Sequence, residues 1–159
     1  MKMVKIKKYL GVLCLMFLIT TTGTTVISSP VFNQESEYSV ETLDKFILAT
    51  KQISLIQEQG EQKMVETIEN EDLDIDTFNK IAEMMINPEN AEQIEVTPRQ
   101  MDSFTFVLEK LQLLQIEIQQ EMEQAIVDNN MSIEDYQKIV EDYHNNPAFQ
   151  QQINEMLQE

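Results

Sequence analysis

An internal repeat constrains the fold of this 159-residue chain more than any other feature. At an offset of 58 residues, 12 of the 45 positions from Leu43 to Asn87 are identical without a gap. The identical residues of the first copy are Asp44, Phe46, Leu55, Gln57, Gln62, Met64, Ile68, Ile75, Lys80, Ile81, Glu83 and Asn87. The repeat predicts two copies of one structural unit, residues 39–95 and 96–159, which pack together because neither copy buries its apolar face alone.

The second copy opens with a strong signal for the start of a helix. Thr97 is suited to cap the helix, Pro98 to occupy its first position, and Gln100 to complete a capping box. No glycine or proline interrupts the sequence from Arg99 to Asn129, so a helix about 45 Å long is expected. Its apolar residues recur at helical spacing and are predicted to form one broad face: Met101, Phe104, Val107, Leu108, Leu111, Leu114, Ile116, Ile118, Met122 and Ile126.

A turn and a shorter helix are predicted after each long helix. Asp74 in the first copy and Ser132 in the second are suited to cap these shorter helices. The pairs Asn87-Pro88 and Asn146-Pro147 are expected to end them, because the residue before a proline avoids the helical region. A short final helix is expected after each proline.

The first copy follows the same plan, with a long helix expected from about Glu41 to Asn70 and a weak point at Gly60. No segment shows the alternating pattern of a strand. The prediction is therefore an all-α fold of two tandem helical hairpins, each with a long helix, a turn, a shorter helix and a short tail. The two hairpins are expected to form one packed domain of the four-helix-bundle type.

The N-terminus has the pattern of a secretory signal peptide. The segment Met1–Lys8 is basic, the segment Tyr9–Ile19 is apolar but short for a membrane span, and small residues follow. Cleavage after Ser28 is expected, with Gly23 and Thr25 as alternative sites. An uncleaved N-terminal anchor is the competing interpretation. Cleavage would place the protein in the periplasm or outside the cell, with no further membrane association.

The single cysteine, Cys14, lies inside the apolar part of the predicted signal peptide. Leu13 precedes it where a lipoprotein signal has a small residue, which argues against a lipid anchor. The exported chain would therefore hold no thiol, and neither a disulfide nor a thiolate metal site is expected. Residues 29–38 show no apolar period and are expected to form a flexible leader.

The chain is strongly acidic, with 28 acidic and 11 basic residues and a net charge of −17. Four of the basic residues and none of the acidic ones lie in residues 1–28, so the exported part has a net charge of about −21. A surface of this charge repels phosphate backbones, and nucleic-acid binding is not expected.

The second copy resembles a secreted bacterial family filed as domain of unknown function 4168. The resemblance rests on the helix start at Val96–Phe104, on Met122 with Ala125-Ile126, on the turn Met131–Ile139 and on Asn146-Pro147. In that family the turn begins with Gly-Leu, where this chain has Asn130-Met131. The match covers Val96–Leu157, and the first copy fits more loosely. The resemblance implies a helical hairpin and an exported location, without an assigned activity.

One acidic cluster is a candidate metal site. Asp72, Asp74, Asp76 and Glu83 have the spacing of a calcium-binding loop of the EF-hand type. Thr77 stands where such a loop needs glycine, and the second copy lacks the acidic pattern. The favoured interpretation is that Asp74 caps a helix and Asp76 complements the helix dipole.

No catalytic site is predicted. His144 is the sole histidine, and its place near a helix end is favourable for a cation. Pairs such as Glu121/Glu123 and Glu134/Asp135 are expected by chance in so acidic a chain. No enzymatic activity and no cofactor are therefore expected.

The predicted function is an exported, non-enzymatic helical module that binds other proteins or itself. A chaperone-like role and an envelope-associated role are both compatible with acidic, methionine-rich amphipathic helices. The polar side of the second long helix is rich in glutamine and is a further candidate contact face: Gln112, Gln115, Gln119, Gln120 and Gln124. The alternative is a cation-responsive, calcium-binding helical module that uses the Asp72–Asp76 cluster.

Overall fold

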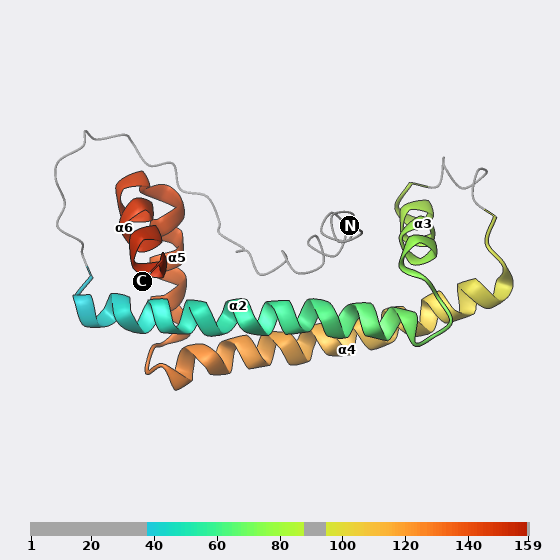
Figure 1. Ribbon diagram of the computed structural model, residues 1–159, viewed down its shortest axis with the longest axis horizontal. Coiled ribbons are helices and arrows are strands. Elements are labelled where there is room, and N and C mark those ends of the chain that lie inside the picture. The colour runs from blue at the N-terminus through green and yellow to red at the C-terminus, as the bar shows by residue number, and fades with distance from the viewer. Residues whose placement is uncertain (1–37, 88–94, 159) are drawn as a thin grey trace. The chain divides into compact units, whose positions relative to one another are not determined.

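The computed structural model describes residues 38–87 and 95–158 (Figure 1). The predicted signal peptide, Cys14, most of the predicted leader and the segment that begins at Pro88 lie outside the described residues. The short helix expected after Pro88 therefore stays a prediction.

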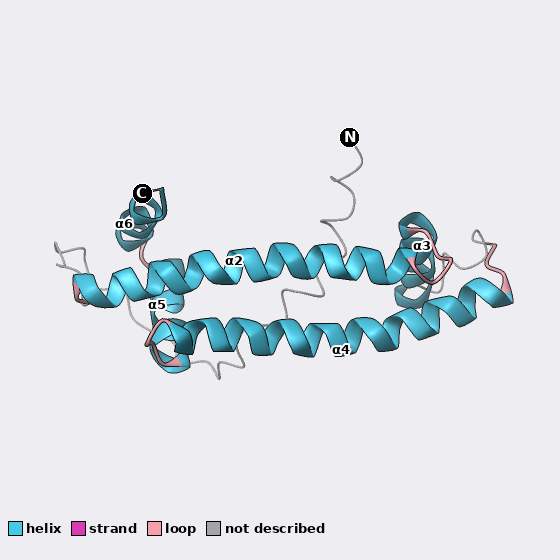
Figure 2. Cartoon of the chain, turned by 60° about the horizontal axis from the view of Figure 1, so that its bottom comes forward, coloured by secondary structure: helices cyan, strands magenta, loops and turns pink. Residues whose placement is uncertain are grey.

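The described residues form helices and connecting turns, and they include no strand (Figure 2). The helices are α2 (Val40–Glu69), α3 (Ile75–Ile86), α4 (Pro98–Asp128), α5 (Ile133–Asn145) and α6 (Pro147–Gln158). The predicted all-α helical bundle is confirmed, as is the order of a long helix followed by a shorter one in each copy. The helix expected after Pro147 is α6.

The predicted capping box of α4 is present. The backbone N–H of Gln100 donates to the Thr97 hydroxyl at 3.2 Å, and the Thr97 N–H donates to the Gln100 side-chain oxygen at 2.9 Å. These two bonds satisfy backbone donors that a helix start leaves without partners. Pro98 follows as the first helical residue.

The shorter helices also begin at the predicted residues. The Asp74 carboxylate accepts the N–H of Thr77 at 2.8 Å, and the Ser132 hydroxyl accepts the N–H of Asp135 at 3.0 Å. A third cap, not predicted, is formed at α6, where the side-chain oxygen of Asn146 accepts the backbone N–H groups of Ala148 at 3.1 Å and Phe149 at 3.2 Å. Each cap fixes the point at which the chain changes direction.

Both long helices end at a residue with left-handed backbone. Asp72 has a φ of 56° and Asn130 a φ of 55°, and these residues are equivalent in the two copies. After α4 the Met131 N–H donates to the Ile126 carbonyl at 3.3 Å and the Asn130 N–H to the Val127 carbonyl at 2.9 Å. This pattern is a Schellman motif, in which glycine is the usual left-handed residue.

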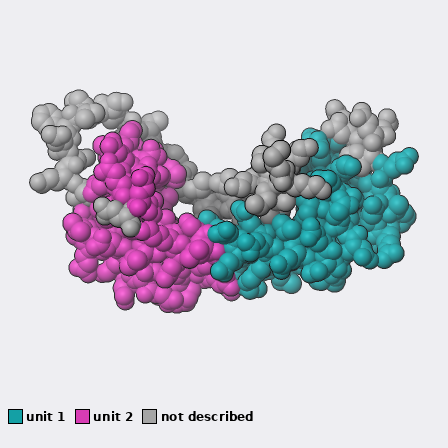
Figure 3. Space-filling view, viewed as in Figure 1, with its two compact units in different colours: residues 1–18, 57–119 teal, residues 19–56, 120–159 magenta. Residues whose placement is uncertain are grey.

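Close contacts divide the chain into two compact units (Figure 3). Among the described residues, the first unit contains 57–87 and 95–119, and the second contains 38–56 and 120–158. The division falls inside α2 and inside α4, so each unit contains part of both long helices. The compact units therefore do not coincide with the two sequence repeats.

The core of the first unit joins α2, α3 and α4. Its most deeply buried apolar residues come from all three helices and from the turn after α2: Met64, Ile68, Leu73, Phe78, Ile81, Phe104, Val107, Leu111 and Ile118. Their burial removes apolar surface from water, which is the main force that holds the helices together.

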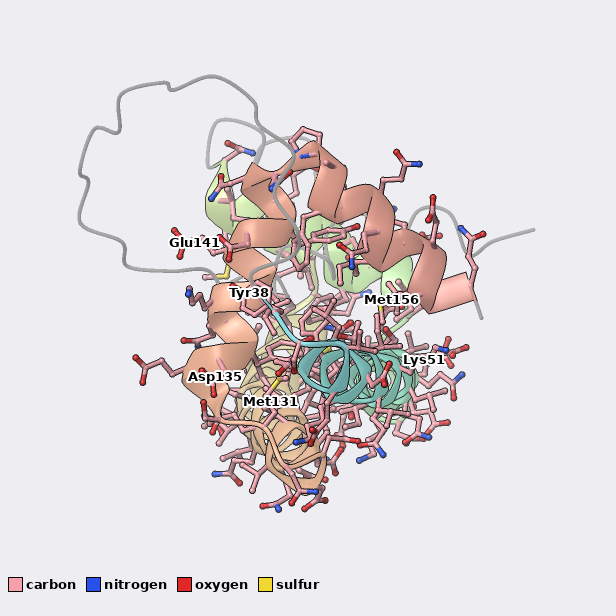
Figure 4. All side chains as sticks on the ribbon, turned by 90° about the vertical axis from the view of Figure 1, so that its left-hand side faces the viewer. Tyr38, Lys51, Met131, Asp135, Glu141 and Met156 are labelled. Atoms are coloured by element: carbon pink, nitrogen blue, oxygen red, sulfur yellow. The ribbon has the colours of Figure 1, made fainter. Side chains whose placement is uncertain are left out.

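The core of the second unit joins α2, α4, α5 and α6. Its buried residues form one cluster, which includes Met131, labelled in Figure 4: Leu43, Phe46, Ile47, Ala49, Ile126, Met131, Ile139, Phe149 and Ile153. At the start of α2, the ring centroid of Tyr38 lies 5.6 Å from that of Phe149, and its hydroxyl donates to Asp142 of α5. Tyr38 thus attaches the beginning of the described chain to the C-terminal helices.

Equivalent aromatic pairs are present in the two units. Phe78 and Phe104 have ring centroids 5.0 Å apart in the first unit, and Tyr136 and Phe46 have the same separation in the second. Phe46 is equivalent to Phe104, and Phe78 to Tyr136. Each pair therefore takes one ring from each copy, and the repeats hold each other through reciprocal contacts.

One residue predicted for the apolar face of α4 is not in the core. Ile116 was expected to widen the apolar face of α4, but its side chain is 54% exposed. Ile116 and the buried Ile118 are two residues apart, which places them about 200° apart around a helix. The two side chains therefore cannot share one face.

Candidate functional site

The acidic turn between α2 and α3 was the strongest candidate for a metal site. The Asp72 carboxylate forms an ion pair with the Arg99 guanidinium at 2.9 Å. The Asp74 carboxylate accepts two bonds of 2.8 Å, from the N–H and from the hydroxyl of Thr77. The Thr77 N–H is the main reason why the pKa of Asp74 is lowered, followed by the Thr77 hydroxyl.

These contacts favour the interpretation of Asp74 as a cap. Asp76 lies in the first turn of α3, where a negative charge is stabilised by the helix dipole. Glu83 lies near the other end of the same helix. Within residues 38–87 and 95–158, no group of three or more His, Cys, Asp or Glu side chains is placed to hold a metal ion.

A polar cavity of about 510 Å³ lies beside this turn, between it and the start of α4. It is lined by Asp72, Thr97, Arg99, Gln100 and Ser103. Most of these polar groups already have partners, because Asp72 pairs with Arg99 and Thr97 with Gln100. The cavity is therefore a by-product of helix capping and offers few groups for chemistry.

The residues considered for acid–base chemistry are also in ordinary surroundings. His144 is exposed in the last turn of α5, as predicted, and its ring contacts Tyr143 edge-on at 5.5 Å. Asp135 accepts the Ser132 hydroxyl at 2.6 Å and so takes part in capping α5. Glu121 and Glu134 are exposed.

The family model for domain of unknown function 4168 (DUF4168) matches residues 41–153, which span both sequence repeats. The chain belongs to the DUF4168 family. Membership therefore extends over the first copy, whose motifs resemble the family more loosely than those of the second. No curated protein and no solved structure matches the chain.

The DUF4168 family has no assigned activity. Other candidate functional residues are the exposed apolar side chains on the described helices. Among the large apolar side chains exposed on the long helices, four lie at equivalent positions of the two copies: Leu48 is 56% exposed, Leu55 58%, Phe106 48% and Leu113 69%. An offset of 58 residues relates Leu48 to Phe106 and Leu55 to Leu113. The exposed apolar pair thus occurs at the same positions in both copies.

Sequence reasoning missed these four residues, although a signal for them was present. Leu48 and Leu55 are seven residues apart, so they lie on one side of α2, and the same is true of Phe106 and Leu113 on α4. Buried residues occupy other positions around the helices, such as Leu43 on α2. The pattern that indicated them was an apolar pair that lies outside the main apolar face and occurs in both copies.

The glutamine-rich side of α4 is polar, as expected. Gln112, Gln119, Gln120 and Gln124 are exposed, and the Gln124 amide donates to Asp128 at 2.7 Å. In the described part of the chain, no helix combines the length and the apolar character needed to cross a membrane.

Proposed function

We propose that this DUF4168 chain is an exported, non-enzymatic module that binds other proteins through the outer faces of its long helices. The observation that carries the proposal is the pair of exposed apolar residues repeated in both copies, Leu48 with Leu55 and Phe106 with Leu113. Single exposed apolar residues are common on protein surfaces. A pair kept at one register on two helices is instead typical of a surface that contacts a partner.

Export is the second part of the proposal. It is supported by the basic segment Met1–Lys8 followed by the short apolar segment Tyr9–Ile19. The periplasm and the cell exterior are both compatible with this signal. Fractionation of cells that express the tagged protein, together with N-terminal sequencing, would test it. Recovery of uncleaved protein in the cytoplasm would contradict it.

In-cell photocrosslinking tests the binding function. A photoreactive amino acid is placed at Leu55 or at Leu113, and the matched control carries it at Gln137, an exposed polar position of α5. We expect protein adducts from positions 55 and 113 and few from position 137. Many unrelated adducts would indicate a chaperone-like role, and one dominant adduct a dedicated complex. Equal adducts at all three positions, or none, would contradict the proposal.

The calcium-responsive alternative predicts a different result. If Asp72, Asp74, Asp76 and Glu83 bind calcium, the melting temperature should rise with added calcium, and Asp74→Ala should abolish the rise. We expect no calcium dependence in either protein, because Asp72 and Asp74 are engaged by Arg99 and Thr77.

A further inference from the structure

The exposed apolar pairs are part of a longer motif that both copies share. Asp44 precedes Leu48 by four residues, and Asp102 precedes Phe106 by four. We name Asp44, Leu48 and Leu55 the first strip, and Asp102, Phe106 and Leu113 the second strip. The first lies wholly in α2 and the second wholly in α4. In each strip the three residues lie on one side of the helix, because their spacing follows its turns.

We propose that each strip is a docking site for an amphipathic helix with basic residues, so that one chain binds two such helices. This inference rests on the proposed binding function and specifies the chemistry of the partner. Two apolar residues seven apart match the spacing by which amphipathic helices are recognised. The distance from the aspartate to the last apolar residue is about 16 Å at 1.5 Å per residue, a length that a short helix covers.

The charges next to the strips favour a basic partner. Asp44 and Asp102 are exposed, and neither carboxylate forms a hydrogen bond or ion pair with another described residue. Two cations of α4 lie next to the second strip, and both have acidic partners: Arg99 pairs with Asp72 at 2.9 Å, and Lys110 with Glu71 at 2.6 Å. Each aspartate is thus available to a lysine or arginine of the partner.

The Phe106 ring already shows the expected affinity for a cation. The Lys110 ammonium lies 4.4 Å from its centroid, which is the geometry of a cation–π contact. Lys110 occupies one face of this ring, so a basic helix along the second strip would use the aspartate for its charge contact and Phe106 for its apolar contact.

A second copy of the chain is a poorer occupant than a basic helix. The net charge of −17 makes two copies repel each other. Contact between two strips would also bring their aspartates toward one another. A basic partner instead gains from the same charge, both in affinity and in the rate of encounter.

The two strips are expected to differ in strength. Lys51 lies between Leu48 and Leu55, and Figure 4 shows it on the outer side of α2. The equivalent residue of the second strip is Glu109. A positive charge weakens the first strip for a basic helix, and a negative charge strengthens the second, so the second strip should bind more tightly.

The test uses the purified protein and a synthetic helix of about 18 residues, long enough to cover one strip. The probe contains leucines at helical spacing with lysines elsewhere, and its control has glutamate in place of every lysine. Calorimetric titration should show two bound copies of the lysine peptide for each chain, and none of the glutamate peptide.

Charge-neutral variants separate the strips from general attraction to an acidic protein. Leu48→Gln with Leu55→Gln, and Phe106→Gln with Leu113→Gln, should each lose one of the two bound peptides. The loss should be at least about tenfold in affinity, since each buried apolar side chain contributes roughly that factor. Met85→Gln with Ile86→Gln, which removes exposed apolar residues of α3, is the matched control and should keep both.

The aspartates are tested by removal of charge alone. Asp44→Asn and Asp102→Asn should each weaken binding to their own strip by about two- to fivefold, the range of an exposed ion pair. Glu61→Gln removes one exposed charge of α2 outside the strips and should change little. An equal effect of all three substitutions would show that only overall charge matters and would overturn the inference.

Other outcomes would overturn it as well. These are equal binding of the glutamate peptide, a single bound copy, or binding unchanged in both strip variants. Sedimentation that shows self-association lost in those variants would identify a second copy as the occupant instead. If photocrosslinking at Leu55 and Leu113 captures partners while the peptide experiment fails, the binding function stands and only the basic-helix inference is wrong.

Discussion

Gly60 of α2 lies against Ile118 of α4, and the two residues occupy the same position in the two sequence copies. A Cβ atom added to Gly60 would lie 2.6 Å from Cδ1 and 3.1 Å from Cγ1 of Ile118. Both residues are buried. Gly60 therefore lets the long helices approach closely at the point where the copies meet, and α2 continues through it without a break.

Gly60→Ala should reveal this contact through its dependence on residue 118. In an exposed helix interior the substitution would stabilise the protein by about 1 kcal/mol. Contact with Ile118 should cancel that gain in the native background. In Ile118→Ala, which removes both Cδ1 and Cγ1, Gly60→Ala should raise the free energy of unfolding by about 1 kcal/mol. Urea denaturation of the four proteins measures the coupling, and additive effects would show that the contact is unimportant.

Asn130→Ala should destabilise the protein, while Asn130→Gly should not. Residue 130 has a φ of 55°, and a Cβ atom in left-handed backbone costs about 1–2 kcal/mol for most residues. We expect a loss of about 1 kcal/mol for alanine relative to glycine, measured by urea denaturation. Asp72→Ala and Asp72→Gly should differ in the same direction. Equal stability of the alanine and glycine variants would contradict the Schellman motif.

Asp74→Ala should lower the free energy of unfolding by about 1 kcal/mol, the usual effect of losing an N-cap. Ser132→Ala should do the same for the equivalent helix. Thermal and urea denaturation at neutral pH would measure both. A loss in only one of them would show that the two caps are not equivalent in strength.

The lowered pKa of Asp74 predicts a component of acid unfolding. Because its folded pKa lies below the unfolded value of about 4, its contribution is present above that pH and is lost as the pH falls through the folded pKa. Asn caps as well as Asp, so Asp74→Asn should keep stability at pH 7 and lack this component. Asp76→Asn, with the same change in charge, is the control. An acid profile of Asp74→Asn identical to the wild type would contradict the cap.

Tyr136 should make stability fall at alkaline pH. Burial raises its pKa, and the hydrogen bond with the Thr50 hydroxyl at 3.2 Å offsets this only in part. The contribution of Tyr136 to the free energy of unfolding is fully present below the unfolded pKa of about 10. It is lost as the pH rises through the folded pKa, because the tyrosine of the unfolded chain ionises first. Tyr136→Phe should flatten this decline above about pH 10.

The control for Tyr136→Phe is Tyr143→Phe. It removes a hydroxyl that donates to Asn154 in an exposed hydrogen bond. Urea denaturation at several pH values should show the alkaline decline in Tyr143→Phe and in the wild type. If Tyr136→Phe declines as steeply as its control, burial of Tyr136 is not the cause.

The sequence was sufficient to predict the local structure because caps and turns depend on neighbouring residues. Thr97 with Gln100, Asp74 and Ser132 all begin helices as predicted. The calcium spacing at Asp72–Asp76 arose from the same capping chemistry. The list of apolar residues at helical spacing, however, did not test on which side of the helix each residue lies. Ile116 was therefore predicted to be in the core, although its side chain is exposed.

Contacts between the copies could not be predicted from either copy alone. The repeat predicted that the two copies pack together, but it did not predict which residues meet. Phe104 of the second copy packs against Phe78 of the first, and Phe46 of the first against Tyr136 of the second. Gly60 was predicted to weaken its helix. Its actual role depends on the contact with Ile118, which lies 58 residues later in the sequence and is not visible from the first copy alone. The exposed strips were missed because only the main apolar face of each long helix was considered, and these residues lie outside it.

The division of the long helices between the two units sets an order of assembly. Residues 57–119 contribute the described parts of the first unit as one stretch of chain, so that unit is complete in sequence before residue 120 has been made. The second unit joins Leu43 to Ile153, 110 residues later. During synthesis from the N-terminus, the early part of α2 must therefore remain without its packing partners until the last helix has been made. Any factor that protects the emerging chain from aggregation would be needed for that interval and for that segment.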